Sequence, residues 1–321
     1  MTTQSGGPQS LYGTNLFGES AAPKPSGVVA GKFGYSPFTV LDARSGGWQE
    51  RKRAWLALGM RSEAGRANSL TMSAGKWKGR RKQSASGFTL GNTSIFDPAL
   101  CELIYRWFSP DGGQVVDPFA GGSVRGIVAS HTGRRYWGCD LRAEQVTANR
   151  EQGLALCPGG MPPPAWVCGD SMDTLATAPA ADLIFSCPPY GDLEVYSDDP
   201  ADLSAMEWHT FVAAYKRIIL RAVDRLKDDR FACFVVGDFR DAKGFYRNFV
   251  SETIAGFEAC GARLYNEAIL VTPVGTAAMR VTKQFETSRK MAKTHQNVLV
   301  FCKGDPRVAS AACSAIYTGS K

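Results

Sequence analysis

The chain has 321 residues, 44% of them hydrophobic, which is enough for one large α/β core. Its formal net charge is +7, and residues 44–82 alone carry eleven Lys/Arg against two Glu. No apolar run approaches the roughly 18 residues that cross a bilayer, and the first ten residues lack a secretion signal. Nine cysteines without a CxxC pair, with three scattered histidines, exclude a typical zinc site and predict a reducing, cytoplasmic environment without bound metal.

The N-terminal part divides into two segments by composition. Residues 1–35 are rich in Gly, Ser, Pro and Ala without periodicity, which predicts a flexible tail. In residues 36–92, basic side chains interleave with Trp48, Trp55 and Trp77, a pattern that usually faces nucleic-acid phosphates; a merely solvated surface is the alternative. We expect DNA contacts from Arg51, Lys52, Arg53, Lys76, Lys78, Arg80 and Arg81.

Between residues 93 and 305, predicted strands alternate with predicted helices. The helices are expected at 97–108, 121–133, 142–154, 203–227 and 245–260. The strands are expected at 114–118, 134–140, 165–170, 181–189, 231–238, 263–272 and 295–303. This order indicates an α/β, Rossmann-like fold: a mostly parallel twisted sheet with helices on both faces and an antiparallel C-terminal edge pair. Residues 306–321 are expected to form a C-terminal tail.

Ligands in such sheets bind outside the carboxyl ends of the strands, so the residues that end each strand are the informative ones. The first strand ends in "DPFAGGS" (117–123), where Gly121 and Gly122 allow a sharp turn and a close approach to a ligand. The next strand ends at Asp140, 23 residues after the start of that loop. This is about the interval at which an acidic side chain binds ribose hydroxyls.

The following two strands end in "CGDS", which contains Asp170, and in "SCPPY" (186–190). "DPFAGGS" and "SCPPY" resemble the Asp-Pro-Phe-x-Gly-x-Gly cofactor motif and the Asp/Asn/Ser-Pro-Pro-Tyr catalytic motif of S-adenosylmethionine-dependent DNA amino-methyltransferases, especially phage and prophage enzymes. The resemblance covers about residues 93–305. It implies a Rossmann-like methyltransferase fold, S-adenosylmethionine as cofactor, and a base flipped out of double-stranded DNA, in phage DNA modification or restriction protection.

The same resemblance implies roles for single residues. Asp140 would hold the ribose, and Asp170 would bond the adenine amino group. The second glycine of the family motif usually follows one residue later than Gly122, but Ser123 is small enough for the loop to survive. The cofactor-binding residues are then expected to be Asp117, Pro118, Phe119, Ala120, Gly121, Gly122, Ser123, Asp140, Leu141, Asp170 and Ser171, with Ser94 and Phe96 from the preceding segment.

Cys187, Pro188, Pro189 and Tyr190 are the expected catalytic residues. In the family, the residue at the position of Cys187 accepts a hydrogen bond from the target amino group, whereas sulfur is a weak acceptor. Cys187 therefore either replaces the Ser of cytosine-N4 enzymes, or adds as a nucleophile to cytosine carbon 6 for methylation at carbon 5. Carbon-5 enzymes place the cysteine after the proline, which counts against the second hypothesis. A buried structural cysteine is the third.

The connection at 273–296 is basic and long enough to predict a functional loop. We expect DNA contacts there, with a flap packed on the sheet as the alternative. The expected DNA contacts of this connection are Arg280, Lys283, Arg289, Lys290 and Lys293.

Asp192, Glu194 and Asp238 either assist the chemistry or cap local structure, and His131 and His209 are expected at the surface. An RNA base methyltransferase and a DNA-binding protein without catalysis remain alternatives.

Overall fold

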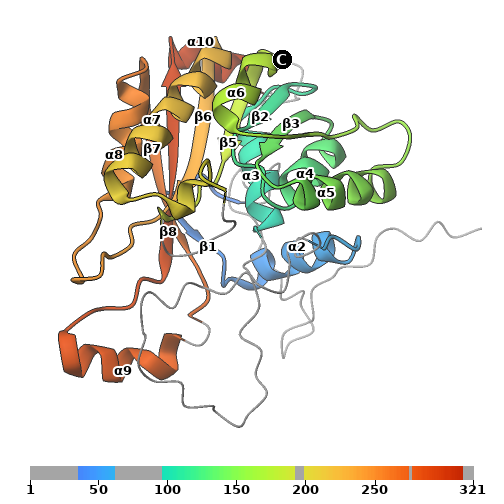
Figure 1. Ribbon diagram of the computed structural model, residues 1–321. Coiled ribbons are helices and arrows are strands. Elements are labelled where there is room, and N and C mark those ends of the chain that lie inside the picture. Colours follow the sequence, from blue (N-terminus) through green and yellow to red (C-terminus); the bar gives the residue numbers. More distant parts are fainter. Residues whose placement is uncertain (1–34, 62–95, 192–198, 275–276, 314–321) are drawn as a thin grey trace, which may run out of the picture.

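The computed structural model describes residues 35–61, 96–191, 199–274 and 277–313. Within them, eight strands form one sheet in the order β1-β7-β8-β6-β5-β2-β3-β4 (Figure 1). The strands are β1 (Val40–Asp42), β2 (Gln114–Asp117), β3 (Arg135–Asp140), β4 (Ala165–Cys168), β5 (Ala181–Ser186), β6 (Leu226–Val236), β7 (Ala262–Val271) and β8 (His295–Lys303).

The sheet is mostly parallel. Only β8 runs antiparallel, and it does so to both of its neighbours, β6 and β7. The expected Rossmann-like fold with a C-terminal antiparallel pair is thus confirmed. One strand was not foreseen: β1 pairs in parallel with β7, Leu41 opposite Leu270, and covers the outer edge of that pair. Three residues are too few to show a strand period in the sequence.

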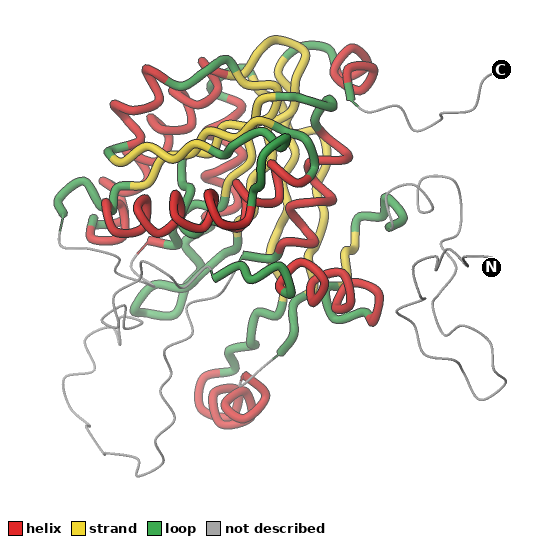
Figure 2. The backbone as a smooth tube through the Cα atoms, turned by 90° about the vertical axis from the view of Figure 1, so that its right-hand side faces the viewer, coloured by secondary structure: helices red, strands yellow, loops and turns green. Residues whose placement is uncertain are grey.

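Helices cover both faces of the sheet, as Figure 2 shows after a quarter turn. They are α2 (Gly46–Leu56), α3 (Pro98–Phe108), α4 (Val124–His131), α5 (Ala143–Leu156), α6 (Ser171–Thr174), α7 (Trp208–Arg225), α8 (Phe249–Glu258), α9 (Ala277–Ser288) and α10 (Pro306–Ala312). Two short 3₁₀ helices lie at Leu175–Thr177 and Leu203–Ala205. In the described part of the chain, no helix has the length and apolar character needed to span a membrane.

Strand alternation divides the core into two layers. Val115 of β2 packs with the α3 and α4 side chains, while its neighbour Val116 packs on the opposite face with those of α7 and α8. Phe185 and Ile184 of β5 divide in the same way. Because both faces are buried, the central strands consist of near-continuous apolar runs, which is why the sequence predicted them well.

The tryptophans of α2 have a structural role. Trp48 is fully buried, and its Nε1 donates a hydrogen bond to Oδ2 of Asp97 at 3.0 Å. Trp55 donates from Nε1 to Oε2 of Glu102 at 2.8 Å. Both acceptors lie at or in α3, so these rings dock α2 against α3. Trp48 is too deeply buried to contact DNA, contact of Trp55 with DNA stays a prediction, and Trp77 lies outside the described residues.

Two of the three basic residues of α2 also contact α3. Arg51 pairs with Glu102 at 2.9 Å, and Lys52 pairs with Asp97 at 3.3 Å. Of the three, Arg53 is the exposed one. DNA contact by this helix stays a prediction, carried mainly by Arg53. The other expected contacts of this segment lie outside the described residues: Lys76, Lys78, Arg80 and Arg81.

The connection between β7 and β8 contains helix α9, where a loop was expected. Residues 277–288 include no glycine or proline and several good helix formers, so the run can hold a helix between less regular ends. Figures 1 and 2 both show α9 standing apart from the layers that cover the sheet. Arg280 lies on this helix, and Lys283 on it and Arg289 just after it are exposed.

Candidate active site

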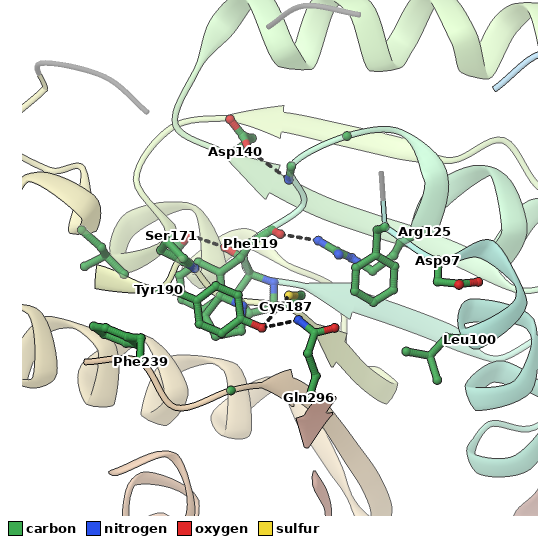
Figure 3. Close-up of a pocket in the computed structure, with 18 of the residues that line it drawn as sticks. Asp97, Leu100, Phe119, Arg125, Asp140, Ser171, Cys187, Tyr190, Phe239 and Gln296 are labelled. Atoms are coloured by element: carbon green, nitrogen blue, oxygen red, sulfur yellow. Dashed lines mark hydrogen bonds between the residues drawn. The ribbon is translucent and has the colours of Figure 1, made fainter. Parts of the chain in front are cut away.

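A cavity of about 680 Å³ lies where the carboxyl ends of β2, β3, β4 and β5 meet. Its size is that of a small-molecule site. The walls come from the loops that follow these strands, from the end of β6, and from the start of β8 (Figure 3). The strand-end residues singled out in the sequence therefore do converge on one rim, with the exceptions described next.

Asp117 is the first exception, because it lies beneath the cavity and not in its wall. Its buried carboxylate accepts hydrogen bonds from Arg125 Nε at 2.6 Å, Tyr136 Oη at 2.8 Å, Ser186 Oγ at 2.5 Å and the backbone N–H of Phe119 at 3.1 Å. A buried carboxylate needs such partners. The predicted contact of Asp117 with the cofactor is therefore replaced by a structural role: its carboxylate anchors the loop from below.

Arg125 holds the same loop, although no feature of the sequence singled it out. Its NH2 group donates to the carbonyls of Phe119 at 2.5 Å and Ala120 at 3.0 Å, and its guanidinium lies 4.6 Å from the ring centre of Phe96. Burial by itself would lower the pKa of Arg125, but Asp117, Tyr136 and Cys187 together outweigh it and raise that pKa. The loop is therefore shaped by a buried, charged scaffold.

The glycine turn itself lines the cavity. Gly121 has a φ of +51°, and the space where a Cβ would stand is open, so the backbone at this point is exposed to a ligand. Gly122, Pro118 and Phe119 also line the cavity. Ala120 and Ser123 do not: both are fully buried below the loop, which corrects their predicted contact with the cofactor.

Asp140 lies in the cavity wall beside Leu141. Its Oδ2 accepts from the backbone N–H of Gly121 at 3.0 Å, and its Oδ1 accepts from the N–H of Arg142 at 3.0 Å. Burial raises the pKa of Asp140 to about 6, although these hydrogen bonds oppose the shift. Each carboxylate oxygen has a second lone pair, so Asp140 can still accept hydrogen bonds from a ligand.

Asp170 and Ser171 stand at the beginning of α6 and also line the cavity. Asp170 caps that helix, its Oδ1 accepting from the N–H of Met172 at 2.8 Å. Its Oδ2 has no hydrogen-bond partner among the residues that the structure describes. Ser171 Oγ donates to the carbonyl of Pro118 at 2.5 Å and so connects two of the cavity loops.

The Cys-Pro-Pro-Tyr turn (187–190) forms the neighbouring wall, and all four residues contact the cavity. The sulfur of Cys187 lies 3.9 Å from Oη of Tyr190. Gln296 of β8 donates from Nε2 to the same hydroxyl at 2.6 Å, as Figure 3 shows. The Tyr190 ring meets Phe239 nearly edge-on, at 6.4 Å between ring centres. Gln296 was not predicted, because only the antiparallel insertion of β8 brings it here.

Ionisable groups also line the cavity beside Tyr190. Asp238, two residues after the end of β6, lines the cavity with Lys293 and His295. Burial lowers the pKa of Lys293, against the opposing influence of Asp238. Burial and the charge of Lys293 together lower the pKa of His295. Asp238 also caps α8, with its Oδ1 accepting from the N–H of Val250 at 3.1 Å.

The remaining predicted residues divide as follows. Phe96 lines the cavity, whereas Ser94, Asp192 and Glu194 lie outside the described residues. His209 is exposed, as expected, while His131 is half-buried and its Nε2 lies 2.8 Å from the carbonyl of Leu156. Within the described ranges, no cluster of His, Cys, Asp and Glu is able to hold a metal ion.

No family model and no curated protein matches this sequence. Among solved structures, TrmN from Thermus thermophilus is similar at 16% identity and a TM-score of 0.43, over 64% of this chain and 48% of that one. A TehB-like SAM-dependent methyltransferase from Corynebacterium glutamicum is 17% identical with a TM-score of 0.37, over 61% and 82% of the two chains. A putative DNA modification methylase, also from Thermus thermophilus, is 16% identical with a TM-score of 0.32, over 42% and 51%.

This chain thus matches about half the length of TrmN. Its own sheet order, with one antiparallel strand between β6 and β7, is that of a Rossmann-like α/β protein.

Proposed function

We propose that the protein is an S-adenosylmethionine-dependent DNA methyltransferase that modifies the exocyclic amino group of a flipped cytosine or adenine. One observation carries this proposal. A single cavity is lined both by the two carboxylates suited to a nucleoside, Asp140 and Asp170, and by the Cys-Pro-Pro-Tyr turn suited to a base. Modification of phage or prophage DNA, or protection against restriction, is the setting that the motif resemblance favours.

The cofactor half of the cavity fits the nucleoside part of S-adenosylmethionine. Asp140 retains lone pairs for the ribose hydroxyls, and Oδ2 of Asp170, which no described residue contacts by a hydrogen bond, is an acceptor for the adenine amino group. The open backbone at Gly121 leaves room for the methionine part. When bound, the cofactor supplies an electrophilic methyl group.

The base half of the cavity needs two hydrogen-bond acceptors for the target amino group, because accepting both hydrogens leaves the nitrogen lone pair available for attack. The carbonyl of Pro188 is the first. Cys187 stands where the second is expected, and sulfur accepts weakly. Gln296 is a better acceptor: its Nε2 is bonded to Tyr190, while its Oε1 has no partner among the described residues. We assign the second acceptor to Gln296 Oε1, with Tyr190 stacking on the base.

Mass spectrometry of nucleosides tests the proposal. Duplex DNA is incubated with the protein and S-adenosylmethionine carrying an isotopically labelled methyl group, and is then digested. The expected products are labelled N4-methylcytosine or N6-methyladenine. Label in structured RNA and none in DNA would instead identify an RNA base methyltransferase. The absence of label in any nucleoside would refute methylation of nucleic acid by this site.

A second candidate is methylation of cytosine carbon 5. It is favoured by Arg125, whose guanidinium is close enough to Cys187 for the two to interact electrostatically. In that reaction the Cys187 thiolate adds to carbon 6 and carbon 5 takes the methyl group. A base then removes the carbon-5 proton, and the thiolate leaves as the ring double bond re-forms. Labelled 5-methylcytosine, together with covalent trapping of the protein on 5-fluorocytosine DNA, would support this candidate.

A further inference from the structure

A turn that the sequence analysis did not single out protrudes beside the cavity. Residues 237–239, directly after β6, line the cavity, and the chain then folds into a turn at 240–247 before α8 begins. Arg240 and Tyr246 form an antiparallel bridge across this turn. The N–H of Asp241 donates to the carbonyl of Phe245 at 2.9 Å, and its carboxylate accepts from the N–H of Phe245 at 2.9 Å. The turn is therefore ordered by its own hydrogen bonds.

The tip of this turn carries two exposed aromatic residues. Phe245 is 72% exposed, and Tyr246 is 42% exposed. The guanidinium of Arg240 lies 3.9 Å from the ring centre of Tyr246. Exposed aromatic rings flanked by cations are typical of surfaces on which nucleic-acid bases stack, since every base presents a π face.

A second segment, residues 289–293, packs against the turn. Lys290 approaches Gly244 so closely that a Cβ on this glycine would collide with its Nζ, and Lys293 Nζ lies 6.0 Å from the Tyr246 ring centre. The turn and this segment, about fifty residues apart in the sequence, thus form one surface, here called the basic aromatic surface. It consists of Phe245 and Tyr246 with the cations Arg240, Lys243, Lys290 and Lys293. Arg247 and Arg289 belong to the same two segments and lie over the rings of Trp208 and Phe285.

The charge of this surface is strongly one-sided. Over residues 238–247 and 289–293, six basic side chains stand against two carboxylates, Asp238 and Asp241. Asp241 is committed to the turn, and Asp238 caps α8 in the cavity wall. The solvent-facing side of the basic aromatic surface is therefore positively charged, which complements a polyanion.

We propose that the basic aromatic surface holds the nucleic-acid strand on one flank of the flipped nucleotide, with Lys243 and its basic neighbours on phosphates and Phe245 stacked on an adjacent base. The inference rests on the proposed function, because the surface adjoins the cavity: the turn follows the cavity residue Phe239, and Lys293 belongs to both. A nucleic-acid strand with one nucleotide in the cavity must also contact the surface around the cavity opening. A nucleic acid is favoured over an acidic protein because its alternating phosphates and bases match alternating cations and aromatic rings.

The test compares binding of a fluorescently labelled DNA duplex by wild type, Phe245→Ala and Lys243→Ala at several salt concentrations. Matched controls are Val308→Ala and Arg307→Ala on α10, which lies at the opposite end of the sheet from α9 (Figure 1). Phe245→Ala should weaken binding about tenfold with an unchanged salt slope, because stacking carries no charge. Lys243→Ala should reduce the slope of log K against log salt by about one. The controls should bind within about twofold of wild type.

Two failures are distinguishable. If wild type binds and methylates DNA while Phe245→Ala and Lys243→Ala bind like the controls, this inference is wrong and the proposed function stands. If wild type binds no nucleic acid at all, the proposed function fails, and this inference fails with it. Thermal unfolding of each variant is expected to match wild type, because Phe245 and Lys243 are exposed.

Discussion

Replacing Gln296 by leucine, which has nearly the same size but no polar group, tests the assignment of the second acceptor. The change removes the 2.6 Å hydrogen bond to Tyr190, worth about 1 kcal/mol net. It also leaves the second amino hydrogen of the flipped base without an acceptor, which costs about 1 kcal/mol or more. Together these losses reach about 2 kcal/mol, or about 30-fold in kcat/KM.

Two further variants separate these contributions. Tyr190→Phe keeps the stacking ring and removes only the hydroxyl, so it should cost about fivefold, the loss of a single hydrogen bond. Gln296→Glu keeps an acceptor oxygen and should retain most of the activity. The assay is single-turnover methyl transfer to duplex DNA, which measures chemistry apart from product release.

The reasoning is refuted if Gln296→Leu and Tyr190→Phe reduce the rate equally. In that case Gln296 only orients Tyr190 and does not contact the base. It is also refuted if Gln296→Leu stays within about twofold of wild type in kcat/KM, since no lost acceptor would then be detectable.

The same cavity supports three other predictions. Burial raises the pKa of Asp140 to about 6, and a ribose binds the ionised form. Affinity for S-adenosylmethionine should therefore fall up to about tenfold per pH unit below 6. Calorimetry should find no such pH dependence in Asp140→Asn, and its persistence in that variant would exclude Asp140 as the cause. Arg125→Met leaves the buried carboxylate of Asp117 without its cation and should reduce stability to urea by about 3–5 kcal/mol; a loss below about 1 kcal/mol would show that the pair does not hold the loop. Cys187→Ser should keep methyl transfer to an amino group, because the second acceptor is assigned to Gln296 and no thiolate is needed; an inactive serine variant would favour the nucleophilic mechanism.

The sequence predicted the strand ends well because buried parallel strands leave an unmistakable apolar run, and loops end each run. Gly121, Asp140, Asp170 and the Cys-Pro-Pro-Tyr turn could therefore be assigned to one rim without a structure. The topology of parallel strands brings such positions together regardless of the details of packing.

The motif at 117–123 could not show which of its side chains are buried. Asp117 belongs to the same motif as Gly121, yet its carboxylate turns inward to Arg125, which lies in the first turn of the next helix. An arginine inside an apolar helix has no sequence signal that separates a buried partner from a surface residue. In α2, likewise, the spacing of Trp48 and Trp55 among cations matched a nucleic-acid surface, while the indole N–H groups in fact bond the carboxylates at and in α3.

Contacts between segments that are distant in the sequence could not be predicted either. Gln296 meets Tyr190 only because β8 inserts antiparallel between β6 and β7. The turn at 240–247 meets Lys290 for the same reason. Predicting either contact needs the register of β8, which depends on the hydrogen-bonded sheet and not on local sequence.

Isothermal titration calorimetry of S-adenosylmethionine with the purified protein most directly tests the central claim, that the cavity binds this methyl donor. The account predicts binding at one site per chain, competition by S-adenosylhomocysteine, strong weakening in Asp140→Ala, and wild-type affinity in Arg307→Ala on the opposite rim. Absence of binding by wild type, or binding unaffected by Asp140→Ala, would contradict the assignment of this cavity to the methyl donor.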